Sequence, residues 1–108
     1  MKIRQENYGD LIHEGIKSGD ADRLQQISRA LHRLDELACN VGYDEGGPED
    51  RRKDRLEEEG KKLAEKYDLL FYHQGDPRGW SVYLVKPERL GGYNIDAVYD
   101  RGTAVCPH

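Results

Sequence analysis

The residues best suited to chemistry gather around one short loop. His73 comes just before the segment 75–79, in which Asp76 stands two residues ahead of Arg78. An arginine can hold a phosphate or a carboxylate through paired hydrogen bonds, and a histidine or an aspartate can transfer a proton. One reading is therefore a small enzyme, or a nucleotide- or phosphate-binding protein, that uses this loop with Arg101 nearby.

The same loop also has the composition of a structural turn. Pro77 can preset the first turn residue, Asp76 can accept hydrogen bonds from nearby backbone amides, and Gly79 can adopt a positive φ. On this reading Asp76 chiefly fixes the turn, while Arg78 is exposed and can contact a carboxylate or phosphate of a partner. The sequence leaves open whether the loop is a binding site or only a turn.

Nucleophilic and metal chemistry have weaker support in the sequence. Cys39 would need a histidine within reach to act as a nucleophile. His73 could serve only if the helix that ends near Cys39 meets the loop 75–79. The four histidines do not fall at ligand spacing with each other or with the two cysteines. We therefore predict no metal and no cofactor, and two reduced thiols.

Two apolar runs of alternating character flank the loop. Residues 69–74 and 80–86 have the period of two expected for strands, and together with the loop they predict a β-hairpin. Both faces of this hairpin carry large side chains, and we expect Tyr72 and Tyr83 to be neighbours, with Tyr99 close by. Such aromatic residues are either the rim of a thin core or the anchors of a binding surface that includes Trp80.

The strongest helical pattern covers residues 21–39. Its apolar residues recur every three or four positions, which predicts a helix that faces its own core. The members of this stripe are Leu24, Ile27, Leu31 and Leu34. We expect Gly19 to provide a left-handed cap for the preceding helix, and Asp20 to accept the free amides of this one.

A second long helix is predicted from Pro48 to Tyr67. Proline suits the first helical turn, and Glu57 with Lys61 has the spacing of a stabilising surface pair. Gly60 lies on the side of the few apolar residues and would permit close approach to a neighbour. The alternative, in which the basic residues of this helix contact nucleic acid, is disfavoured because acids interleave with them.

These elements predict an α+β fold in a single domain, residues 1–108. Two or three N-terminal helices should pack on a small antiparallel sheet of three or four strands. After the hairpin, residues 97–99 are a candidate short strand and residues 103–106 a last one. The unpaired edge of so small a sheet also leaves a homodimer open.

The charge balance bears on the class of partner. Charged residues make up 35% of the chain and the formal net charge is -4. A protein that binds a phosphate backbone through bulk charge has the opposite sign, so the composition disfavours free nucleic acid and favours a protein partner. No apolar run reaches the roughly 20 residues that span a bilayer, so no membrane association is expected.

Three segments together resemble short proteins of tailed bacteriophages and prophages. They are residues 38–40 (Ala-Cys-Asn), residues 75–84, in which the loop leads into Trp-Ser-Val-Tyr-Leu, and residues 99–105 (Tyr-Asp-Arg-Gly-Thr-Ala-Val). The likeness covers residues 37–105. It implies an early or accessory phage protein that acts in the cytoplasm of the bacterial host. The group has no assigned activity, so the resemblance transfers no catalytic residues.

The sequence thus favours a non-enzymatic accessory protein that binds and modulates a host or phage macromolecule. An inhibitor of bacterial defence would fit this description. The binding residues we predict are Arg78, Asp76, Trp80, Tyr72, Tyr83 and Arg101. The alternative is the small enzyme or phosphate-binding protein built on His73, Asp76 and Arg78, and we name no catalytic residue.

Overall fold

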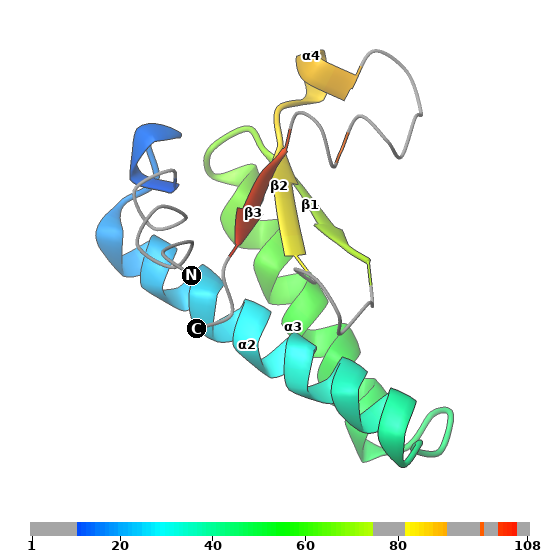
Figure 1. The fold of residues 1–108 in the computed structure, drawn as a ribbon. Coiled ribbons are helices and arrows are strands. Elements are labelled where there is room, and N and C mark those ends of the chain that lie inside the picture. The colour runs from blue at the N-terminus through cyan, green and yellow to red at the C-terminus, as the bar shows by residue number, and fades with distance from the viewer. Residues whose placement is uncertain (1–10, 75–81, 91–97, 99–101, 106–108) are drawn as a thin grey trace.

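The computed structural model describes residues 11–74, 82–90, 98 and 102–105. Figure 1 shows two long helices that lie side by side, with three strands across one side of the pair. This is the α+β arrangement expected from the sequence. In chain order the elements are α2 (Ser18–Asn40), α3 (Pro48–Glu65), β1 (Leu70–His73), β2 (Val82–Val85), α4 (Pro87–Leu90) and β3 (Thr103–Val105).

The sheet has the order β1-β2-β3, and both pairings are antiparallel. The predicted hairpin is therefore present, with His73 opposite Val82 at the end of β1. The prediction of a short strand at residues 97–99 is wrong at Val98, the one of these residues that the structure describes. Val98 is helical and buried instead of belonging to the sheet.

Alternation along the strands separates the two faces of the sheet. Phe71 and His73 share one face with Val82 and Leu84, and this face meets the helices. The core between them is apolar and fully buried at its centre, and Leu24, Ile27 and Leu31 of the predicted helical stripe belong to it. Its buried members include Leu11, Ile16, Leu24, Ile27, Leu31, Ala64, Leu69, Val82, Leu84 and Val105.

The start of α2 differs from the prediction. Gly15, with φ of 85°, is the left-handed residue before the helix, and α2 begins at Ser18, so Gly19 lies inside the first turn. Asp20 does not cap the helix either. Its carboxylate accepts hydrogen bonds from the Tyr67 hydroxyl and, at 2.9 Å, from the Lys66 ammonium. These contacts join the start of α2 to the turn after α3.

The helical hairpin has well-defined ends. Gly42, with φ of 84°, donates its N–H to the Leu37 carbonyl at 2.8 Å, which closes the last turn of α2 as a left-handed glycine can. Pro48 then starts α3, as predicted. The helix ends at Glu65, two residues earlier than expected, and Asp68 turns the chain into β1 with φ of 57°.

Two close contacts hold the layers together. An ideal Cβ built on Gly60 would lie 2.6 Å from Cζ of Phe71, so α3 approaches β1 as only glycine allows. On the other side, the buried Ser28 hydroxyl donates to the Val105 carbonyl at 2.8 Å and ties α2 to β3. Among the helices of the described residues, none is both long enough and apolar enough to cross a membrane.

Candidate functional site

His73 is the centre of a polar cluster between the sheet and both long helices. Its Nε2 lies 2.9 Å from Oδ2 of Asp35 on α2, and its Nδ1 lies 2.9 Å from Oε2 of Glu57 on α3. The side chains of His73 and Asp35 are 5% and 7% exposed, and that of Glu57 is 24% exposed. We call these three residues the His73 cluster.

The geometry favours a protonated His73. Only an imidazolium has an N–H on both ring nitrogens, and both nitrogens face a carboxylate here. Burial by itself would lower the pKa of His73, but the hydrogen bonds to Asp35 and Glu57 outweigh it and raise the pKa to about 9. In turn, the hydrogen bond from His73 holds the pKa of Glu57 below its usual range, against the opposing effect of burial.

This placement corrects the role expected for His73. The sequence predicts a place for His73 beside the loop 75–79, whereas its ring contacts α2 and α3 through Asp35 and Glu57. Because both ring nitrogens are engaged by carboxylates, His73 is not placed to activate Cys39, which is exposed in the last turn of α2. Glu57 is hydrogen-bonded to His73, and the predicted partner Lys61 also acts on its carboxylate through its charge.

The second candidate is the face of the sheet that points away from the helices, which we call the outer face. Tyr72 and Tyr83 are directly opposite each other in the β1–β2 register, so the predicted tyrosine pair is present. Both are half-buried, and Leu70 beside them on β1 is 44% exposed. Val85, opposite Leu70, is buried, so part of this face is covered.

The remaining predicted site residues cannot be placed relative to this face. Asp76, Arg78, Trp80 and Arg101 lie outside the described residues, and so does Tyr99. Tyr72 and Tyr83 are therefore the described members of the predicted binding set.

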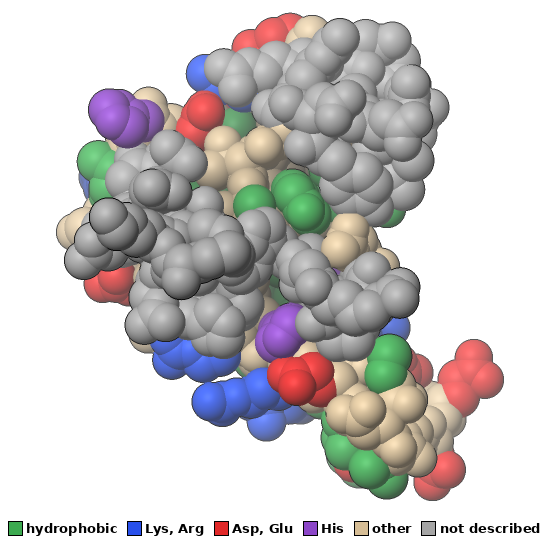
Figure 2. Space-filling model, viewed as in Figure 1, with side chains coloured by type: hydrophobic (Ala, Val, Ile, Leu, Met, Phe, Trp, Pro, Cys, Tyr) green, Lys and Arg blue, Asp and Glu red, His purple; other side chains and the backbone are tan. Residues whose placement is uncertain are grey.

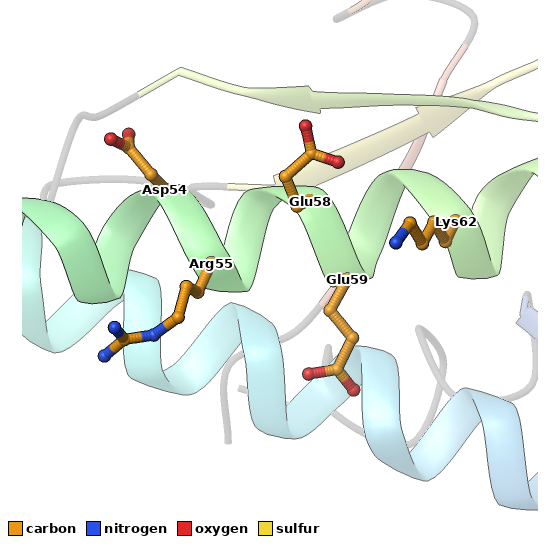
Figure 3. A pocket seen from close by; sticks show the side chains of 5 residues that line it. All are labelled: Asp54, Arg55, Glu58, Glu59 and Lys62. Carbon is orange, nitrogen blue, oxygen red and sulfur yellow. The ribbon is translucent and has the colours of Figure 1, made fainter.

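A shallow hollow on α3 is a third place where polar side chains gather. Asp54, Arg55, Glu58, Glu59 and Lys62 line it, and all five come from this one helix. Figure 3 shows that Asp54 and Glu58 leave the helix on one side, whereas Arg55 and Glu59 leave it on the other. Glu59 is also bound by Arg23 of α2, with Nη2 2.6 Å from Oε1. These side chains diverge (Figure 3), and Glu59 is paired with Arg23, so they do not converge on a ligand.

The charged surface is mixed over the face that can be seen. Figure 2 shows Lys and Arg side chains along α2, and acidic and hydrophobic side chains together at the free end of the α2–α3 hairpin. Val41 at that end is 81% exposed. Within the described part of the chain, no group of three or more His, Cys, Asp or Glu residues is arranged to hold a metal ion.

No protein-family model, curated protein or solved structure matches this chain.

Proposed function

We propose that this chain is a small phage-type accessory protein that binds and modulates a host or phage protein in the bacterial cytoplasm. Inhibition of a bacterial defence protein is one role that would fit. The observation that carries the proposal is the cross-strand pair of Tyr72 and Tyr83 on the outer face, next to the exposed Leu70.

Aromatic pairs of this kind are suited to a protein partner. A tyrosine brings a large apolar ring with few rotatable bonds, so it loses little conformational entropy when a partner covers it. The hydroxyl at its tip can still bind a polar group at the edge of the contact. Leu70 would add aliphatic surface on the same face, and the loop 75–79 that follows β1 would supply Arg78 as a charged contact that fixes the orientation.

The arrangement of charges favours this proposal over the enzyme or phosphate-binding alternative. That alternative needs His73 at the loop, with a ring nitrogen available to a ligand. Both of its ring nitrogens are instead held at 2.9 Å by Asp35 and Glu57. The net charge of -4 also favours a protein over a nucleic acid as the partner.

The partner and the face it covers can be identified in one experiment. A photo-cross-linking amino acid is placed at Leu70 on the outer face, and separately at Ile12, which has nearly the same exposure, 43% against 44%, but lies outside the sheet. Each protein is irradiated in a bacterial host lysate. We expect one defined adduct from position 70 and none of that mass from position 12.

The identified partner is then purified and its affinity for variants is measured. Tyr83→Ala should weaken binding at least about tenfold, as loss of an interface anchor does. Tyr43→Ala is the matched control, because Tyr43 is also half-buried but lies in the turn between α2 and α3. Equal losses for both variants, or an adduct from position 12 alone, would show that the outer face is not the binding surface.

A further inference from the structure

We propose that the His73 cluster is a pH-dependent latch, in which the protonated imidazole holds the end of β1 against α2 and α3, and loss of its proton releases that end. The three residues come from three different elements and are 16 and 38 positions apart in sequence. The inference concerns the fold itself and does not depend on the proposed function.

The number of hydrogen-bond donors on the His73 ring depends on its protonation. A neutral imidazole keeps one N–H and presents a lone pair on the other nitrogen. In this cluster the lone pair would face a carboxylate oxygen at 2.9 Å, whichever tautomer forms. One contact would therefore become repulsive. Asp35, which is almost fully buried, and Glu57 would both lose the opposing charge, and one of them would also lose its hydrogen bond.

The charged groups around the His73 ring favour its protonated form. Asp35 faces His73 from α2 and Glu57 faces it from α3, while Val82, its neighbour on β2, is apolar. Lys53 and Lys61 lie one turn on either side of Glu57 and act on that carboxylate. With two carboxylates in direct contact with the ring, the charged form of His73 is favoured, and its pKa is raised to about 9.

The sign of the pH dependence follows from this. In an open state, His73 would titrate near its ordinary value of 6.5, whereas in the closed state it keeps its proton up to about pH 9. Between these values the closed state binds one more proton than the open state. Opening should therefore become more favourable by about tenfold for each pH unit in this range.

The His73 cluster lies at one end of β1. His73 is the last residue of β1, and among the described strands β1 is at the edge of the sheet, where it pairs with β2 alone. Leu70, at the other end of the strand, is followed by Phe71, which packs against Gly60 and the core. Release should therefore begin at the His73 end of β1, while the core around Leu24 and Leu31 stays folded.

Hydrogen exchange measured by mass spectrometry between pH 6.5 and 9.5 tests the latch. Rates are corrected for the intrinsic pH dependence of amide exchange. We expect protection of a peptide covering residues 70–74 to fall by about tenfold per pH unit between pH 7 and about 9, and to level off above that. Protection of a peptide covering residues 24–31 should stay constant. A parallel loss in both peptides, or no loss in either, would overturn the proposal.

Two variants separate the latch from a general effect of histidine. His73→Gln should abolish the pH dependence at residues 70–74. His32→Gln is the control, because His32 lies on α2 outside the His73 cluster, 3.2 Å from the more exposed Glu36, and this variant should keep the dependence. If His73→Gln does not fold, an NMR titration of the unmodified protein decides: a His73 ring that titrates at or below pH 6.5 rules the latch out.

Discussion

Oδ2 of Asp35 on α2 lies 2.9 Å from Nε2 of His73 on β1, although the two residues are 38 positions apart in the chain. Both side chains are almost completely buried. A buried carboxylate without a counter-charge is strongly unfavourable, so the two groups depend on each other. This pair fixes how α2 sits against the end of the sheet.

Removal of one partner should therefore destabilise the fold. We expect Asp35→Ala to lower the free energy of unfolding by about 3 kcal/mol, because it leaves a buried imidazolium with one carboxylate. Asp35→Asn, which keeps an acceptor oxygen, should cost less. The control is Glu36→Ala, the next residue, whose side chain is 51% exposed and should change stability by less than about 1 kcal/mol. Urea unfolding at pH 7 measures all three, and equal effects of Asp35→Ala and Glu36→Ala would contradict the burial argument.

The carboxylate of Glu57 should make the protein sensitive to acid. Because its pKa in the folded state lies below the ordinary value of 4.5, its stabilising contribution is complete above that value and is lost as pH falls through the folded pKa. Glu57→Gln should thus be less stable than the unmodified protein at pH 7, by about 1–3 kcal/mol. The difference should shrink below pH 4.5. Glu58→Gln, an exposed neighbour, should follow the unmodified protein at every pH.

The main elements of the fold could be predicted from the sequence because their signals are local. The three- and four-residue spacing of Leu24, Ile27, Leu31 and Leu34 predicts a buried helical face, and all four are buried. Alternation around the loop predicts the hairpin and the Tyr72–Tyr83 pair, because a register follows from which face is apolar.

The His73 cluster could not be found in this way. Asp35 lies beside the apolar stripe and Glu57 on a helix rich in acids, so neither stands out among 21 acidic residues. Their meeting with His73 depends on how two helices pack on a strand, which no local spacing encodes. One signal was available: His73 belongs to the same strand face as Leu69 and Phe71, which places it toward the core.

Substitution by alanine should change stability in opposite directions at two helical glycines, because Gly60 lies where α3 approaches β1 and Gly19 does not. Gly60→Ala would place a Cβ inside the contact distance of the Phe71 ring, and we expect it to destabilise by about 1–3 kcal/mol despite the higher helix propensity of alanine. Gly19→Ala meets nothing within 4 Å and should stabilise α2 by up to about 1 kcal/mol. Thermal melting of the two variants checks this. A stabilising Gly60→Ala would mean that the helix and the strand can separate without loss.

The apolar stripe of α2 makes a further prediction. Leu31 is 0% exposed within the core, so Leu31→Ala should cost about 2–5 kcal/mol through lost burial and the cavity it leaves. Val41, 81% exposed just past the end of the helix, is the control, and Val41→Ala should stay within about 0.5 kcal/mol of the unmodified protein. A loss below about 1 kcal/mol for Leu31→Ala, measured by urea unfolding, would mean that this stripe does not form the core.

The interleaved charges of α3 predict weak binding to nucleic acid and indicate how to create it. Arg51, Arg52 and Arg55 are exposed, but Asp54 and Glu58 are exposed among them and reduce the local positive potential. Fluorescence anisotropy with a short DNA duplex should therefore give no saturable binding below about 10 μM protein at physiological salt.

Replacement of the two acids tests whether charge is the reason. Asp54→Lys with Glu58→Lys raises the charge by two at each position and brings the formal net charge from -4 to 0. This double variant should bind the duplex at low salt and lose affinity steeply as salt is added, because phosphate contacts release counterions. Arg51→Ala should weaken that gained binding. Tight, salt-resistant binding by the unmodified protein would contradict both the charge argument and the choice of a protein partner.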